Sequence, residues 1–293
     1  MPINGLFTFI DSTVYNIAEQ YIGGTKMKLT LLGTGNALVT KCYNTCFVLS
    51  ENGEYFLVDA GGGNQIFSQL EKVGMKWQDM KHIFVTHKHL DHIMGIIWMI
   101  RMITQYMNKD KYEGDAYIYG HEEVIGLLRD FADKLLPKKS TRFIDDRLHL
   151  VKLKDGDHFE VLGHPATAFD IQSTKAKQFG FMVEYAPGKK LCDCGDEPYN
   201  PCEEQYAKGA EWLLHEAFCL YGERDIFSPY EKHHSTVKDA AELAESLGVK
   251  NLILYHTEDK NLEHRKELYT AEGKEYYHGN LYVPYDLEDV KVL

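Results

Sequence analysis

A dense group of imidazole and carboxylate side chains lies within residues 87–92, between the apolar segment 82–86 and a second apolar segment that starts at 93. Its members are His87, His89, Asp91 and His92. A tight loop between a strand and a helix points such side chains into one space. Imidazole and carboxylate ligands suit zinc and similar divalent metals. Three histidines and an aspartate in six residues exceed what one ion takes from one loop, so the spacing indicates two adjacent metal ions.

The elements that must position this group alternate between strands and helices from Met27 onward. The hydrophobic pattern predicts strands at 28–32, 45–49, 55–58, 82–86, 116–119 and 251–255, with several more between 148 and 185. It predicts helices at 64–73, from 93 onward, at 122–136 before Pro137, and at 237–247 before Gly248. Asn52-Gly53 predicts a hairpin turn. This order favours an α/β fold with two sheet layers and helices outside.

Composition narrows the class of protein. The 293 residues are 44% hydrophobic and 26% charged, and no apolar stretch approaches the ~20 residues of a membrane span. The net charge of −12 argues against a stable nucleic-acid partner, because such binders are usually basic. Six cysteines without a secretory signal favour free thiols and a cytoplasmic location. Cys192, Cys194 and Cys202 lack the paired spacing of a zinc knot.

Residues 1–26 differ from the rest of the chain. Val14, Ile17, Ala18, Tyr21 and Ile22 have helical spacing before Gly23-Gly24. Two interpretations stay open: a short accessory helix, or a leader that precedes a true start at Met27. The expected organisation is therefore an N-terminal extension, 1–26, and one hydrolase domain, 27–293.

The histidine cluster resembles the H-x-H-x-D-H signature of the metallo-β-lactamase superfamily. Other landmarks follow in the same order: Asp59 after the strand 55–58, Asp196 in Cys-Gly-Asp, and His256 after Tyr255. The resemblance covers roughly residues 27–260. It implies a four-layer αββα sandwich and a metal-dependent hydrolase.

The resemblance also implies a role for each residue of the cluster. His87 and His89 would bind one metal, whereas Asp91, His92 and His256 would bind the other. Asp196 would bridge the two, and Asp59 would orient the loop from behind. The cofactors implied are two divalent ions, zinc or alternatively manganese, and a metal-bound water that becomes the attacking hydroxide.

Two further motifs are similar to the ribonuclease Z branch. Glu216 lies in His-Glu-Ala, and His234 opens His-Ser-Thr before the predicted helix 237–247. In that branch such a pair protonates the departing oxygen, so the resemblance implies that Asp91, His234 and Glu216 take part in catalysis. The alternatives are a polar helix cap for His234 and a surface carboxylate for Glu216.

Two positions depart from the branch. Gln172 stands where a third metal-binding histidine is expected, and an amide is a poor zinc ligand. The tRNA-gripping arm of long ribonuclease Z proteins is replaced by the short segment 186–190. The expected substrate is therefore a small phosphodiester or an RNA 3′ end, handled by a phosphodiesterase. Hydrolysis of a lactone, thioester or amide, or a metal-impaired site, are the alternatives. Relatives suggest a homodimer by analogy.

Overall fold

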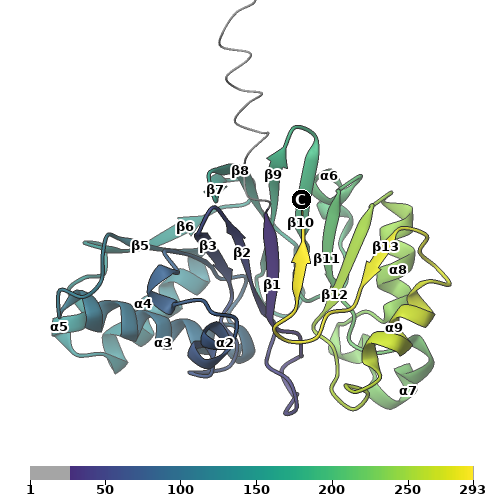
Figure 1. The fold of residues 1–293 in the computed structure, drawn as a ribbon, viewed down its shortest axis with the longest axis horizontal. Coiled ribbons are helices and arrows are strands. Elements are labelled where there is room, and N and C mark those ends of the chain that lie inside the picture. Colours follow the sequence, from purple (N-terminus) through teal and green to yellow (C-terminus); the bar gives the residue numbers. More distant parts are fainter. Residues whose placement is uncertain (1–26, 293) are drawn as a thin grey trace, which may run out of the picture.

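The computed structural model describes residues 27–292 and contains two seven-stranded sheets packed face to face (Figure 1). The N-terminal extension predicted at 1–26 lies outside the described residues. The first sheet has the order β14 (Asp289–Lys291), β1 (Lys28–Gly33), β2 (Cys46–Glu51), β3 (Glu54–Val58), β4 (His82–Phe84), β5 (Ala116–His121), β6 (Leu148–Leu153). The second has the order β13 (Asn280–Tyr282), β12 (Asn251–Tyr255), β11 (Trp212–Glu216), β10 (Lys189–Asp193), β9 (Phe179–Ala186), β8 (His164–Asp170), β7 (His158–Val161).

Helices cover the outer face of each sheet, which makes the four-layer αββα sandwich that the sequence predicts (Figure 1). On the first sheet lie α2 (Ile66–Lys72), α3 (Leu90–Met107), α4 (Glu122–Leu135) and α5 (Lys138–Thr141). The second half carries α6 (Glu204–Ala207), α7 (Arg224–Phe227), α8 (Val237–Ser246) and α9 (Arg265–Gly273). Short 3₁₀ turns occupy Trp77–Asp79, Pro201–Glu203, Tyr221–Glu223 and Tyr230–Lys232. None of the helices in the described part of the chain has the length and apolarity to span a membrane.

Three layers of apolar side chains hold the sandwich together. One lies between the first sheet and its helices and includes Ile96, Ile100 and Leu128. A second lies between the sheets and includes Phe56, Phe84 and Phe181. A third packs the alanine-rich face of α8 against the second sheet. Burial on both sides explains why central strands such as β12 read as continuous apolar runs.

The edges of the predicted elements shift for identifiable reasons. The strand predicted at 82–86 ends at Phe84, because the N–H of Thr86 turns away to the carboxylate of Asp59 in the loop after β3. Helix α3 begins at Leu90, three residues earlier than its apolar pattern indicates. The six cysteines, all within the described residues, are free, as predicted.

Candidate metal centre

Asp59 fixes the backbone of the histidine loop. It follows β3 with a left-handed φ of 55° and accepts hydrogen bonds from the N–H and the hydroxyl of Thr86 at 2.9 and 2.7 Å. Its carboxylate also lies 2.7 Å from Nδ1 of His92. One buried side chain therefore ties the end of β4 to the first turn of α3.

The imidazoles of His87, His92 and His256, the last directly after β12, are oriented through their Nδ1 atoms. Besides the bond of His92 to Asp59, Nδ1 of His87 lies 2.9 Å from the Thr86 hydroxyl. Nδ1 of His256 lies 3.3 Å from the hydroxyl of Thr45. Since Nδ1 is engaged in each ring, Nε2 is directed to the centre.

Asp196, from the loop after β10, brings the second sheet to the same point. Its Oδ2 lies 3.7, 3.2 and 3.4 Å from the Nε2 atoms of His87, His92 and His256. Asp91 approaches from the first turn of α3, with its Oδ2 at 3.3 Å from Nε2 of His92. The structure thus gathers these predicted residues in one buried pocket.

The donor atoms fit two divalent ions. His87, His89 and Asp196 form one group whose ligand atoms lie within 4.8 Å of one another, and Asp91, His92 and His256 form another. Nε2 of His87 and Nδ1 of His89 are 2.8 Å apart and face the same point. Within the described residues, no group forms a hydrogen bond with the buried Nε2 of His92. Such convergence of ring nitrogens and carboxylates suits cation binding.

The pKa values of the buried groups in this pocket shift in different directions. Burial lowers the pKa values of His87 and His256, while the carboxylate of Asp196 opposes the shift in both rings. Burial opposes ionisation of Asp196, yet His87 and His256 outweigh it and hold the Asp196 pKa well below its usual range. For His92 burial lowers the pKa, but Asp91 and Asp59 reverse the shift and raise it well above normal. This excess of carboxylate around His92 is the charge that a bound cation neutralises.

Glu216 and His234 lie beside the centre as a buried pair. Glu216 ends β11 and accepts a hydrogen bond from the N–H of Ser235. Its Oε2 is 3.7 Å from Nδ1 of His234, whose ring stacks on Phe218 and lies 5.1 Å from that of His256. Burial raises the pKa of Glu216 and lowers that of His234 to about 3. The side chain that caps α8 is Thr236, so His234 is free of the capping role weighed from sequence.

The two glutamines of the connection from β8 to β9 lie in different surroundings. Gln172 is exposed, and its N–H donates to Asp170 at 2.9 Å. No hydrogen bond joins its side chain to the candidate ligands in the described part of the chain. Gln178, which sequence reasoning did not single out, is buried and donates to Oδ1 of Asp196 at 2.7 Å. A polar residue directly before the apolar strand β9 was the available signal.

Comparison with known proteins agrees with the fold. The ribonuclease Z of Methanothermobacter thermautotrophicus is 32% identical over 277 residues, which cover 78% of this chain and 86% of that protein. Among solved structures, the metallo-beta-lactamase fold protein YhfI from Bacillus subtilis has a TM-score of 0.74 at 15% identity, with 91% and 99% of the two chains covered. Human tRNase Z, short form, has a TM-score of 0.69 at 22% identity, with 91% and 100% covered.

Fold, centre and relatives together define a metal-dependent hydrolase of the metallo-β-lactamase fold, similar to ribonuclease Z. A family model described as anti-Pycsar protein Apyc1 matches residues 27–274, which is most of the chain. The chain therefore belongs to that family.

Proposed function

We propose that this chain is a two-metal phosphodiesterase that acts on a small phosphodiester. The observation that carries the proposal is the convergence of three Nε2 atoms on one oxygen of Asp196, within 3.7 Å. His87, His89 and Asp196 would hold one ion; Asp91, His92, His256 and Asp196 would hold the other. Zinc is the proposed metal because imidazole dominates the donor set, and manganese is the alternative. Bound metal supplies positive charge for the phosphate oxygens and acidifies water.

The residues of the chain would divide the remaining work. Asp59 and the hydroxyls of Thr86 and Thr45 keep the imidazoles oriented. His234 would give a proton to the departing oxygen from Nε2, since its Nδ1 faces Glu216. Burial raises the pKa of Glu216 and so favours its protonated form. As His234 gives up its Nε2 proton, the proton of Glu216 would pass to Nδ1, which leaves His234 neutral and Glu216 ionised. An alkoxide leaving group needs that proton more than a thiolate does, which favours a phosphodiester over a thioester.

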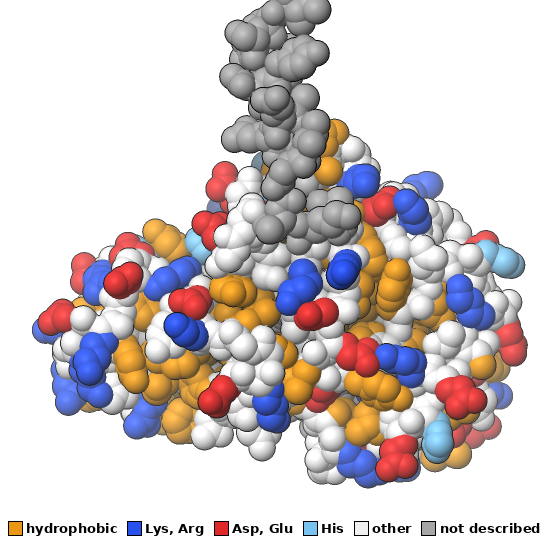
Figure 2. Space-filling model, in the orientation of Figure 1, with side chains coloured by type: hydrophobic (Ala, Val, Ile, Leu, Met, Phe, Trp, Pro, Cys, Tyr) orange, Lys and Arg blue, Asp and Glu red, His pale blue; other side chains and the backbone are white. Residues whose placement is uncertain are grey.

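The connection from β9 to β10 supports a small substrate. Ala186 pairs directly with Lys189, so only Pro187 and Gly188 form the turn. No gripping arm extends from this point of the chain. Lys and Arg side chains alternate with Asp and Glu over the face shown in Figure 2, without a continuous basic tract on that face. A long nucleic acid therefore gains little electrostatic affinity there.

A substrate panel tests this proposal. The purified chain, loaded with zinc, should hydrolyse bis(p-nitrophenyl) phosphate with a kcat/KM at least tenfold above those for a lactone and a thioester. A higher kcat/KM on the lactone or the thioester than on the diester would contradict it. Metal analysis of the same sample separates an active centre from a metal-impaired one. Near two ions per chain supports the proposal, and near zero contradicts it.

An RNA 3′ end is the second candidate substrate, favoured by the 32% identity to a protein named ribonuclease Z. A tRNA precursor with a 3′ extension belongs in the same panel. Cleavage of that precursor with a kcat/KM above that of small diesters would replace the first candidate by the second.

A cytoplasmic location fits the free thiols. The homodimer stays a prediction by analogy.

A further inference from the structure

Gln178 is held beside the metal centre by backbone hydrogen bonds of its own carbonyl and of the next residue. Its carbonyl accepts from the N–H of Ile171 at 3.1 Å, and its side chain is 1% exposed. The next residue, Phe179, donates its N–H to the carbonyl of Thr86 at 3.0 Å, directly before His87. The start of β9 is thus hydrogen-bonded to the histidine loop, and Gln178 has little freedom to leave the pocket.

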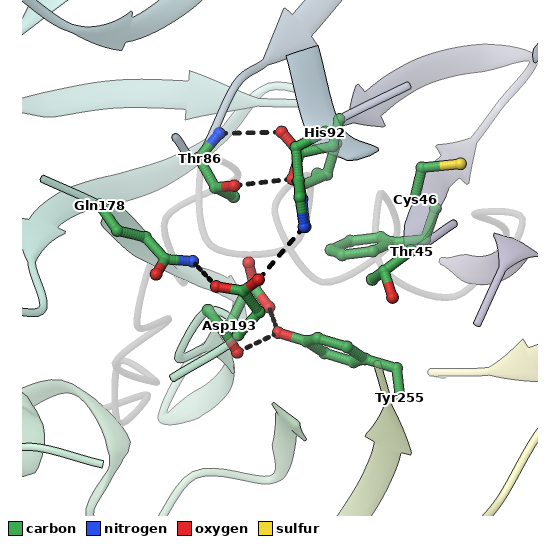
Figure 3. Close-up of a pocket in the computed structure, with 12 residues that line it drawn as sticks. Thr45, Cys46, Thr86, His92, Gln178, Asp193 and Tyr255 are labelled. Atoms are coloured by element: carbon green, nitrogen blue, oxygen red, sulfur yellow. Dashed lines mark hydrogen bonds and ion pairs between the residues drawn. The ribbon is translucent and has the colours of Figure 1, made fainter. Parts of the chain in front are cut away.

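The amide of Gln178 contacts the side of Asp196 that faces away from the imidazoles. Its Nε2 lies 2.7 Å from Oδ1, whereas Oδ2 faces the three Nε2 atoms of the histidines. In Figure 3, Gln178 and His92 approach the middle of the pocket from different sides. The carboxylate is anionic, so the NH₂ group of the amide, rather than its oxygen, must be the one that points to it.

Gly195 makes room for this contact. It has a φ of 77°, and a Cβ at that position would lie 2.8 Å from Nε2 of Gln178. The Cys194-Gly195-Asp196 turn therefore needs glycine for its backbone and for the approach of the amide. Tyr255 supports the same turn, with its hydroxyl 2.7 Å from the carbonyl of Gly195.

We infer that Gln178 is a positioning residue for the bridging carboxylate: its amide holds Oδ1 of Asp196 and leaves Oδ2 to the metals. The inference rests on the two-metal function proposed above. It also explains differently how the site is built without the third metal-binding histidine that was expected at Gln172. The connection from β8 to β9 contributes an amide that fixes an existing ligand, and Gln172 contributes no ligand. Without the amide, Oδ1 is buried unpaired and the carboxylate can rotate.

The test compares two glutamine variants with the wild type. Gln178→Met keeps length and removes the donor, and Gln172→Met tests the competing position. Gln205→Met, at an exposed glutamine of α6, is the matched control. Each protein is stripped with a chelator and titrated with Zn²⁺ by calorimetry in the presence of a competing chelator. Cobalt-substituted samples provide absorption spectra of the ligand field, and thermal unfolding of the metal-free proteins measures structural damage.

We expect Gln178→Met to weaken at least one zinc-binding step by about 10–100-fold, the usual effect of losing a partner that orients a ligand. The cobalt spectrum should change, because the position of Oδ2 changes. Gln172→Met and Gln205→Met should match the wild type in both measurements. Equal zinc constants and spectra for Gln178→Met and wild type overturn the inference, and so does an effect seen in Gln172→Met alone. A lower unfolding temperature of metal-free Gln178→Met with unchanged zinc constants also overturns it. If the wild type binds no zinc, the proposed function itself fails.

Discussion

At the residue scale, the centre is organised by which nitrogen of each imidazole is already occupied. Thr86, Asp59 and Thr45 take the Nδ1 atoms of His87, His92 and His256, so these contacts direct the Nε2 atoms to one point. A preformed set of donors loses less conformational entropy on binding metal than flexible side chains do. The hydroxyl and carboxylate partners are therefore as important for the metal as its direct ligands.

The first prediction concerns His234 as the proton donor. His234→Ala should lower kcat on a diester with an alkoxide leaving group by about 10²–10⁴-fold, the range of general acid catalysis. On bis(p-nitrophenyl) phosphate, whose nitrophenolate leaves without a proton, the loss should stay within about tenfold. Steady-state kinetics on both substrates measures the difference.

His233→Ala is the matched control, because the neighbouring His233 is exposed and bonds Thr174 instead of Glu216. It should leave both rates close to wild type. Equal losses of His234→Ala on the two substrates would show that His234 acts elsewhere than on the leaving group.

Much of this centre could be predicted from the sequence, because the loop 87–92 concentrates four donors next to two apolar elements. Asp196, Glu216 and His256 were found only by resemblance, since single acidic or imidazole residues after a strand carry no local signal. Gln178 has only a weak signal in the sequence, a polar residue directly before an apolar strand, because its importance comes from a contact with Asp196 across two strands. A hydrogen bond between residues 18 apart produces no periodic pattern in the sequence that could predict it.

At the element scale, the first turn of α3 packs against the segment that follows β3. The N–H of Gly95 donates to the carbonyl of Gly61 at 2.9 Å, and the N–H of Ala60 donates to that of His92 at 3.2 Å. This contact sets the distance between the Asp59 turn and the helix that carries Asp91. The apolar pattern of α3 shows that the helix is buried but not how closely it approaches the turn.

Gly95→Ala should therefore disrupt the centre through the backbone. The added Cβ would lie 1.9 Å from the carbonyl oxygen of Ala60, which cannot move without displacing Asp59. We expect a loss of about 3 kcal/mol in the free energy of unfolding, at the upper end for overpacking, together with weaker zinc binding. Urea unfolding of the metal-free protein and zinc titration measure the two effects.

Gly126→Ala in α4 is the control, because its Cβ would meet nothing within 4 Å. This variant should be more stable by about 0.5–1 kcal/mol, the difference in helix propensity. If the two variants change the free energy of unfolding alike, close packing of α3 against Ala60 is not the reason that residue 95 must be glycine.

The second 3₁₀ turn, Pro201–Glu203, contains a buried carboxyl group that should make the stability of the fold depend on pH. Burial raises the pKa of Glu203 to about 8 from 4.5, although one oxygen accepts from the N–H of Asn200 at 2.7 Å. The folded protein therefore keeps a proton that the unfolded chain releases, and this contribution to stability is lost as pH rises from about 4.5 to about 8. Glu203→Gln should abolish that loss. Relative to wild type, it should gain about 2 kcal/mol or more between pH 5 and pH 9.

Unfolding midpoints in urea at several pH values measure this gain. Glu204→Gln, at the exposed neighbouring residue, should follow the wild-type pH profile. If the difference in the free energy of unfolding between Glu203→Gln and wild type is the same at every pH from 5 to 9, Glu203 is ionised in the folded state.

The elements themselves were predictable to different degrees. Long apolar segments gave β1, β5, α4 and β12 within a few residues. The edge strands β13 and β14 have three residues each, too few to show alternation. Strand β14 forms by pairing Lys291 with Lys28 across the whole chain. Only tertiary packing creates such a strand, so sequence periodicity does not contain it.

At the scale of the whole molecule, the two halves of the sandwich each supply part of the centre. The first sheet and α3 provide Asp59 and residues 87–92, whereas loops of the second sheet provide Asp196, His234 and His256. The halves also meet where the N–H of Thr257 donates to the carbonyl of Thr34 at 2.9 Å. A pair of ions bound between them, as proposed, would connect the halves in the folded state and would have no equivalent site in the unfolded chain.

Metal binding should therefore stabilise the whole chain by mass action. Zinc at 100 times its dissociation constant should add about 2.7 kcal/mol per occupied site to the free energy of unfolding, which is roughly 5–10 °C in Tm per site for a domain of this size. Asp196→Ala removes the carboxylate that both proposed ion groups share. At the same zinc concentration, the rise in Tm of this variant should be less than about a third of the wild-type rise, and its hydrolysis should be abolished. Calorimetric scans of chelator-treated and zinc-loaded samples measure both shifts. Because the ligands come from both halves, the gain should appear as one later unfolding transition. Two separate transitions, with only one moved by zinc, would mean that the ions bind to a single half and that the shared site is wrong.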